Sequence, residues 1–197
     1  MSENFNPNSD SKKDRLPPGQ KEIEEFPALS KGPVPQWPED WKLQIFGTVK
    51  EEKRFTLSEI KKMPEVLTQR QDFHCVEGWS KLNLEWTGIR FKDLIGRVDV
   101  EKEAEHVLFH ALDGYTTNLP LEVCLQDDIL IAWKLNGEQI PPQHGGRVRT
   151  VVESKYAYKS TKWLSEIELL KEHKRGYWER RGYSDSADIW EENRFNK

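Results

Sequence analysis

The apolar residues of this chain fall into short runs in which apolar and polar residues alternate, and glycine or proline separates one run from the next. A strand that is buried on one face only has this period of two. The clearest runs are residues 41–47, 106–112 and 146–152. Residues 129–135 are mostly apolar, and residues 161–170 are compatible with either strand or helix. The sequence therefore predicts a mainly β, α+β fold in which short helices surround mixed sheets.

Turn and capping signals lie between these runs. Asn136-Gly137 is expected to form a tight hairpin turn, and Trp86-Thr87-Gly88-Ile89 is also expected to turn the chain. Thr56 and Glu59 have capping-box spacing, which predicts the start of a short helix. A second short helix is expected over residues 91–95.

The length of 197 residues is that of one good-sized domain. Residues 1–36 are polar and end in Gly32-Pro33-Val34-Pro35, which predicts an extended or partly disordered arm, with the domain proper over residues 37–197. The aromatic C-terminal segment is expected to pack back on that domain.

The net charge of −4 argues against general nucleic-acid binding. No apolar run approaches the roughly 20 residues of a membrane span. Residues 1–15 lack the apolar core of a secretory signal and a twin-arginine signature, so we expect the protein to stay in the cytoplasm.

Cys75 stands out because polar and aromatic residues surround it, in Phe73-His74-Cys75-Val76-Glu77-Gly78-Trp79-Ser80. A thiolate in such surroundings is a candidate nucleophile or soft metal ligand. The only other cysteine is Cys124, and two cysteines cannot hold an ordinary iron–sulfur cluster. A haem attachment motif is also missing. A redox enzyme with this sequence would therefore need an external electron carrier.

Anion-binding side chains gather in a second region. Arg147 and Arg149 alternate along the run 146–152, so both are expected on one strand face, and Gly145-Gly146 lets a ligand approach the backbone closely. The following loop contains Lys159-Ser160-Thr161-Lys162. Guanidinium, ammonium and hydroxyl groups together are typical of a phosphate-binding site. A solvated basic strand is the alternative interpretation.

Three classes of function account for some or all of these residues. A cysteine hydrolase would use Cys75 with His144 or His110, and a non-catalytic binding module would use the cationic residues alone. A metal-cofactor oxidoreductase would use both regions.

Taken in order, these segments resemble the molybdopterin-binding domain of the sulfite oxidase superfamily. The resemblance covers about residues 41–183 and is carried by Cys-Val-Glu-Gly-Trp-Ser (75–80), Asn-Gly-Glu (136–138), Pro-Pro-Gln-His-Gly (141–145), Lys-Ser-Thr-Lys-Trp (159–163) and the Gly-Tyr-Trp-Glu tail (176–179). It implies an oxidoreductase with a molybdenum–molybdopterin cofactor. The implied reaction is two-electron oxygen-atom transfer on a small oxyanion, S-oxide or N-oxide, with electrons exchanged with a carrier.

The resemblance also implies residue roles. Cys75 matches the thiolate that ligates molybdenum, and His144 and Arg149 match pterin-binding positions. The hydroxyl and amine groups of residues 160–162 match a loop that holds the cofactor and its phosphate. His110 and Ala111 lie near a further cofactor-contact position. The residues concerned in that loop are Ser160, Thr161 and Lys162.

Two departures leave the substrate open. Sulfite oxidases have Gly-Asn soon after the cysteine, whereas Glu77-Gly78-Trp79 here is closer to the bacterial sulfoxide-reductase branch. Sulfite oxidases also have an active-site tyrosine where this chain has Lys155, with Tyr156 beside it. Lys155 and Tyr156 are therefore further catalytic candidates, and His74 is another because it adjoins Cys75 and could donate a proton beside the metal.

Overall fold

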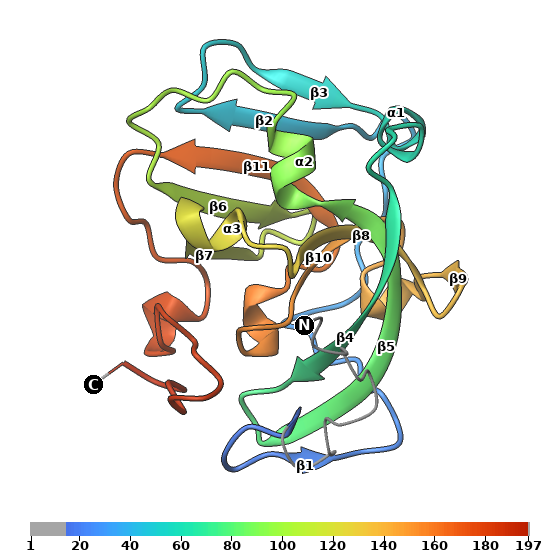
Figure 1. Cartoon of the computed structure of the whole chain (residues 1–197), viewed down its shortest axis with the longest axis vertical. Helices are drawn as coiled ribbons and strands as arrows, with labels where there is room; N and C mark the ends of the chain where they lie inside the picture. Colours follow the sequence, from blue (N-terminus) through green and yellow to red (C-terminus); the bar gives the residue numbers. More distant parts are fainter. Residues whose placement is uncertain (1–14, 197) are drawn as a thin grey trace, which may run out of the picture.

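The computed structural model describes residues 15–196, which form two β-sheets that share a core, with short helices at their edges (Figure 1). The six-stranded sheet contains β1 (Lys21–Glu22), β4 (Leu67–His74), β5 (Trp79–Arg90), β8 (Ile129–Leu135), β9 (Glu138–Gln139) and β10 (Arg149–Val152). The five-stranded sheet contains β2 (Leu43–Gly47), β3 (Lys53–Phe55), β6 (His106–Ala111), β7 (Thr116–Pro120) and β11 (Leu164–Leu170).

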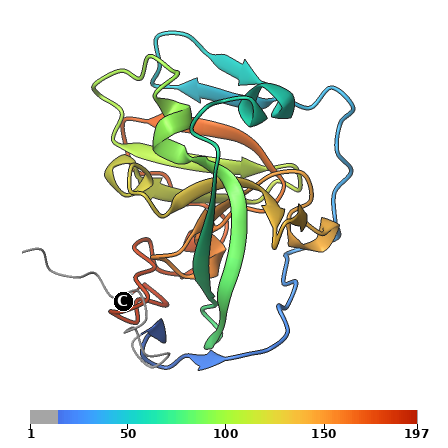
Figure 2. The same cartoon turned by 45° about the vertical axis from the view of Figure 1, so that its right-hand side comes forward.

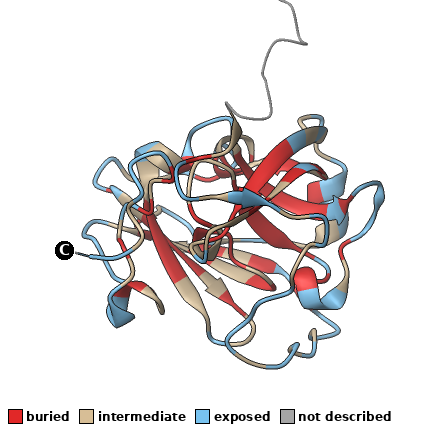
Figure 3. Ribbon diagram, turned by 90° about the horizontal axis from the view of Figure 1, so that it is seen from below, coloured by how far each residue is buried: buried red, intermediate tan, exposed pale blue. Residues whose placement is uncertain are grey.

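Both sheets are mixed. β1 runs parallel to β5 and β2 runs parallel to β11, while the other pairs are antiparallel. The main apolar core lies between the two sheets, and Ile45, Phe109 and Ile131 are among its fully buried members. Figure 3 shows buried residues along the strands of both sheets. The predicted fold class, α+β and mainly β, is confirmed.

Short α-helices and 3₁₀ turns that lie wholly within residues 15–196 complete the described fold. They are α1 (Leu57–Lys61), α2 (Phe91–Ile95), α3 (Leu121–Cys124), η2 (Pro142–His144), η3 (Ala157–Lys159) and η4 (Glu179–Arg181). The capping box predicted for α1 is present, because the backbone N–H of Glu59 donates to Thr56 Oγ1 at 3.2 Å and that of Thr56 donates to Glu59 Oε2 at 2.7 Å. No helix within residues 15–196 is both long and apolar enough for a membrane crossing.

The expectation of a turn at residues 86–89 was wrong, because these residues lie inside the long strand β5. Gly88 is needed there for close approach of the neighbouring strand. A Cβ added at Gly88 would lie 2.4 Å from the carbonyl oxygen of Ile131 in β8. Gly88 is therefore explained by the close packing of β5 against β8 and not by a turn. The register of the β5–β8 pairing shifts beside it, between Thr87 and Gly88.

The expectation that Arg147 and Arg149 share a strand face was also wrong. β10 begins only at Arg149, because Gly145 and Gly146 have positive φ values of 124° and 62° and turn the chain before it. The Arg147 guanidinium lies over the Trp37 ring, whereas Arg149 is buried.

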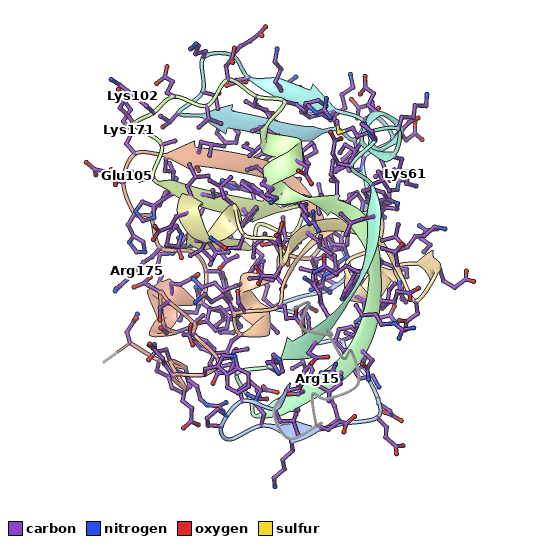
Figure 4. All side chains as sticks on the ribbon, viewed as in Figure 1. Arg15, Lys61, Lys102, Glu105, Lys171 and Arg175 are labelled. Carbon is purple, nitrogen blue, oxygen red and sulfur yellow. The ribbon has the colours of Figure 1, made fainter. Side chains whose placement is uncertain are left out.

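The N-terminal segment from residue 15 to residue 36 runs along one side of the molecule and joins β1 to the strand β2 (Figure 2). Arg15 lies beside the end of the β4–β5 hairpin (Figure 4) and its Nε donates to Asp72 Oδ2 at 2.8 Å. The Lys21 N–H donates to the Gly78 carbonyl at 2.9 Å. Residues 1–14 of the predicted arm lie outside the described residues.

The C-terminal segment is held by a buried ion pair. The Lys159 ammonium lies 2.6 Å from Glu179 Oε1, and neither side chain has any exposed surface. The same ammonium donates to the carbonyl oxygen and the Oδ1 of Asn118 at 2.9 and 2.8 Å. Lys159 therefore joins η3 to η4 and β7, and it is unavailable as an anion ligand.

We expect Lys159→Met to lower the free energy of unfolding by about 3–5 kcal/mol, because it leaves the Glu179 carboxylate buried without its counter-charge. Lys159→Met combined with Glu179→Leu should regain much of that loss. Urea denaturation measures both. The control is Arg175→Ala, which removes an exposed ion pair with Asp185 and should cost less than about 1 kcal/mol. A Lys159→Met loss as small as the control's would contradict a stabilising role for the buried pair.

Candidate functional site

A cavity of about 350 Å³ opens where the β4–β5 hairpin, the N-terminal segment, η2, η3 and the C-terminal segment meet. Its wall includes one thiol, three cations, one imidazole and several aromatic rings. The residues discussed below that line it are Phe26, Leu29, Lys31, Cys75, Glu77, His144, Arg149, Tyr158, Ser160, Lys162, Trp178 and Tyr183.

Cys75 comes directly after β4, in a tight turn that we call the thiol loop, residues 75–79. The Cys75 N–H donates to the Trp79 carbonyl at 2.8 Å, and the Gly78 N–H donates to the Cys75 carbonyl at 3.0 Å. Gly78 has a φ of 96°, which favours glycine in this turn. The side chain of Cys75 is 7% exposed and lines the cavity.

Burial raises the pKa of the Cys75 thiol to about 11, although the backbone N–H groups of Glu77 and Val76 act in the opposite direction. The free thiol is therefore protonated at neutral pH and is a poor nucleophile. The same N–H groups would stabilise the thiolate of a metal-bound cysteine. This environment suits a metal ligand better than a hydrolase nucleophile.

Arg149 is a buried cation that has only uncharged acceptors. Its Nη1 donates to the His144 carbonyl at 2.7 Å and its Nε to the Thr150 carbonyl at 3.1 Å. The guanidinium carbon lies 5.2 Å from the ring centroids of both Phe73 and Trp86. Burial lowers the pKa of Arg149 to about 9. Within residues 15–196 no carboxylate pairs with this guanidinium, so an anion in the cavity would supply the missing counter-charge.

Lys162 is in a similar position at the cavity wall. Its Nζ donates to the carbonyl oxygens of Leu29 at 2.6 Å and Gln143 at 2.7 Å, and the described part of the chain gives it no ion pair. Burial, and then the charge of Arg149, lower the pKa of Lys162 to about 7. Two unneutralised cations beside one cavity indicate an anionic ligand.

His144 lies between these cations and the N-terminal segment. Its ring stacks on Phe26 with centroids 4.5 Å apart and an interplanar angle of 11°. Burial and the charges of Arg149 and Lys162 lower its pKa to about 4, so the imidazole is neutral at pH 7. Its Nδ1 is buried and has no hydrogen-bond partner among the described residues. A neutral imidazole with one free nitrogen can bind a polar ligand edge.

The two hydroxyl residues of the predicted loop differ. Ser160 lines the cavity, and its Oγ accepts the Val152 N–H at 3.0 Å. Thr161 is fully buried, and its Oγ1 finds no partner in the part of the chain that the structure describes.

Six predicted residues do not line the cavity, and Thr161 is one of them. Lys155 Nζ pairs with Asp188 Oδ2 at 3.0 Å, and the Tyr156 ring packs against Ala187 and Ile189. His74 bonds to Ser80, and His110 pairs with Glu168 at 2.9 Å. Ala111 is buried at the end of β6. A catalytic or binding role for these six stays a prediction.

The sequence reasoning missed two walls of the cavity. The N-terminal segment contributes Phe26, Leu29 and Lys31, and the C-terminal segment contributes Trp178 and Tyr183. Single aromatic or apolar residues in an otherwise polar arm, Phe26 above all, were the available signal. The tail aromatics were expected to pack, but not at this cavity.

Comparison with known proteins gives a consistent result. Residues 31–178 match the family model described as the oxidoreductase molybdopterin binding domain. The uncharacterized oxidoreductase YuiH of Bacillus subtilis is 39% identical over 183 residues, which cover 92% of each chain. Such an alignment cannot fit within residues 31–197, so it includes part of the N-terminal segment.

More distant relatives are longer than this chain. The protein-methionine-sulfoxide reductase catalytic subunit MsrP of Ralstonia nicotianae is 28% identical over 68% of this chain and 44% of its own length. Mitochondrial sulfite oxidase of Drosophila melanogaster is 28% identical over 81% of this chain and 33% of its own length. The sulfane dehydrogenase SoxCD of Paracoccus pantotrophus has a similar fold, with a TM-score of 0.66 at 19% identity over 76% of this chain and 42% of that chain.

Proposed function

The chain belongs to the oxidoreductase molybdopterin binding domain family and is a molybdopterin-dependent oxidoreductase of the sulfite oxidase type, and we propose that it performs oxygen-atom transfer with Cys75 as the protein ligand of molybdenum. The observation that carries the proposal is the cavity itself, whose wall contains one buried thiol and two cations, Arg149 and Lys162, without carboxylate partners among the described residues. A cysteine hydrolase is disfavoured, because burial keeps the thiol protonated.

The residues of the cavity fit the molybdenum–molybdopterin cofactor. Thiolate is the soft donor that such a metal prefers. Arg149 and Lys162 would hold the anionic phosphate, and the unpartnered Nδ1 of His144 would bind a polar edge of the pterin. Ser160, which lines the cavity, is a further candidate for this contact.

When bound, the cofactor supplies two-electron oxygen-atom exchange between substrate and water. The protein residues orient it and exclude solvent. The N–H groups of Val76 and Glu77 stabilise the sulfur in its anionic form, and the Phe26–His144 stack closes the cavity on the side of the N-terminal segment. Electrons would pass to or from an external carrier, and a cytoplasmic location stays a prediction.

Within this reaction type we propose an uncharged S-oxide or N-oxide as the substrate, in preference to sulfite. Glu77 lies at the cavity wall beside Cys75, and Tyr158, Trp178 and Tyr183 line the same cavity. Burial raises the pKa of Tyr183, and the negative charge of the Glu77 carboxylate raises it further. A carboxylate and aromatic rings disfavour a small dianion and suit a neutral organic molecule.

The first test is the ligand. Protein from a host that makes the cofactor should hold about one molybdenum per chain, as expected for a single thiolate site. Cys75→Ser should lower turnover by more than about a hundredfold, since even supporting residues of metal sites cost 10–100-fold, and should remove the metal–thiolate absorption. Cys124→Ser, at a thiol buried away from the cavity, should retain both. Parent-like turnover in Cys75→Ser would refute the assignment.

The second test is the pH dependence of cofactor retention, read from pterin fluorescence after gel filtration. Lys162 has a pKa of about 7 without an anion, and a bound phosphate would raise it, so binding takes up a proton. Retention should be highest below pH 7 and fall above it, by up to about tenfold per pH unit. In Lys162→Arg the side chain keeps its charge above pH 7, so cofactor retention should fall less steeply with pH. This variant distinguishes titration of Lys162 from titration of the cofactor phosphate. An equally steep fall in Lys162→Arg would exclude Lys162 as the phosphate ligand.

The third test is the substrate class. The parent protein should reduce methyl aryl sulfoxides with a higher kcat/KM than it oxidises sulfite, in dye-coupled assays. Glu77→Gln should raise the sulfite kcat/KM by roughly three- to tenfold, because it removes like-charge repulsion, and should leave the sulfoxide value nearly unchanged. Glu85→Gln, on β5 and absent from the cavity lining, is the control. A sulfite preference in the parent protein that Glu77→Gln leaves unaltered would disprove this substrate assignment.

A further inference from the structure

A chain of side-chain hydrogen bonds connects His74 to the backbone of Cys75 through the N-terminal segment. His74 Nδ1 lies 2.8 Å from Ser80 Oγ, and Ser80 Oγ donates to Gln20 Oε1 at 3.1 Å. Gln20 Nε2 donates to the Cys75 carbonyl at 3.0 Å. Because the serine proton goes to Gln20, the imidazole must donate from Nδ1, so all three bonds run in one direction.

The direction of these hydrogen bonds determines the orientation of the Gln20 amide. A carbonyl can only accept, so the amide nitrogen of Gln20 must face Cys75 and its amide oxygen must face Ser80. Ser80 is fully buried and His74 is 3% exposed, so water competes little for these groups. The amide of Gln20 therefore connects Ser80 in β5 to the carbonyl of Cys75 in the thiol loop.

Backbone pairing holds Gln20 at this place. β1 follows it directly and runs parallel to β5, with Lys21 opposite Trp79 and Glu22 opposite Ser80. The Ile23 N–H donates to the Ser80 carbonyl at 2.9 Å. The N-terminal segment thus adds the strand β1 beside the start of β5, where the thiol loop ends. This pairing positions Gln20 next to the carbonyl of Cys75.

The C-terminal segment holds the neighbouring residue, Val76. Arg194 Nη1 donates to the carbonyl of Val76, and its guanidinium carbon lies 5.0 Å from the Tyr156 ring centroid. Carbonyls of adjacent residues in the thiol loop are therefore held by side chains from opposite ends of the chain. The backbone hydrogen bonds of the loop already close the hairpin, so neither side-chain contact is required for the turn itself.

We infer that Gln20 is a positioning residue for the Cys75 thiol, acting through its bond to the Cys75 carbonyl, and that Ser80 and His74 orient Gln20. Positioning the thiol has a function only if Cys75 is the metal ligand, so the inference rests on the proposed function. The effect of Gln20 on the thiol can nevertheless be measured in protein without cofactor. Gln20 lies outside residues 31–178, the range of the family match.

The test compares the two cysteines of the full chain made without cofactor. Iodoacetamide labelling is followed by mass spectrometry at one pH, and Cys124, which is fully buried, is the internal reference. Gln20→Ala should speed labelling of Cys75 by roughly three- to tenfold relative to Cys124, the worth of about one hydrogen bond. Ser80→Ala should act in the same direction with a smaller factor. Gln20→Glu should resemble Gln20→Ala, because a carboxylate cannot donate to the carbonyl.

Gln126→Ala is the matched control, since its amide also donates to a backbone carbonyl, that of Glu122, on the exposed surface. It should leave the labelling ratio of the two cysteines at the parent value. An unchanged ratio in Gln20→Ala, or equal acceleration of both cysteines, would show a merely structural role and overturn the inference.

A second measurement uses the loaded protein. Gln20→Ala should keep about one molybdenum per chain, as the single thiolate site predicts, but shift the metal–thiolate absorption band. An unshifted band would overturn the inference. Persistence of the band in Cys75→Ser would instead defeat the proposed function, and the labelling result in cofactor-free protein would still stand.

Discussion

The buried guanidinium of Arg149 is the constraint on which the site depends. Two aromatic rings and backbone carbonyls surround it, and the described chain offers no carboxylate to pair with it. Burying a cation in this way is costly unless a ligand supplies the opposite charge. The position of Arg149 also determines its neighbours, since it holds the carbonyl of His144 and lowers the pKa of Lys162. One strand residue thereby organises the imidazole and the second cation into a single anion site.

The thiol side of the cavity is organised differently, by contacts that are distant in sequence. The β4–β5 hairpin provides the turn, but residues from both ends of the chain hold its carbonyls, through Gln20 and Arg194. The Lys159–Glu179 pair fixes the tail segment that carries Trp178 and Tyr183. The cavity therefore exists only when both ends are packed.

This division explains what the sequence could and could not predict. The capping box at Thr56 and the strands over residues 106–111 follow from local patterns, and both are present. The Cys75, His144 and Arg149 positions were found because each belongs to a short motif, and all three line the cavity. Gly88 was wrongly predicted to lie in a turn. A glycine is required there because of close contact with the carbonyl of Ile131, which lies 43 residues away in sequence.

The missed walls have the same cause. Phe26 and Gln20 lie in a polar segment without periodicity, and only pairing of β1 with β5 brings that segment to the cavity. For Lys159 the error is the opposite one, because a residue outside the site was predicted to belong to it. Its position next to Ser160 suggested an anion ligand, whereas Lys159 forms an ion pair with Glu179. Local sequence specifies the groups that carry chemistry, and tertiary packing decides which of them share a surface.

The cost of the site also bears on how it acquires its cofactor. Arg149, Lys162 and the free Nδ1 of His144 are all less favourable in the folded protein than they would be in water. The fold tolerates them because separate features stabilise it, namely the core between the sheets and the Lys159–Glu179 pair. An anionic ligand that satisfies all three groups relieves this cost on binding, so the relief adds to affinity and the ligand stabilises the folded state. Selectivity for an anionic cofactor thus arises from groups that the protein alone leaves unsatisfied.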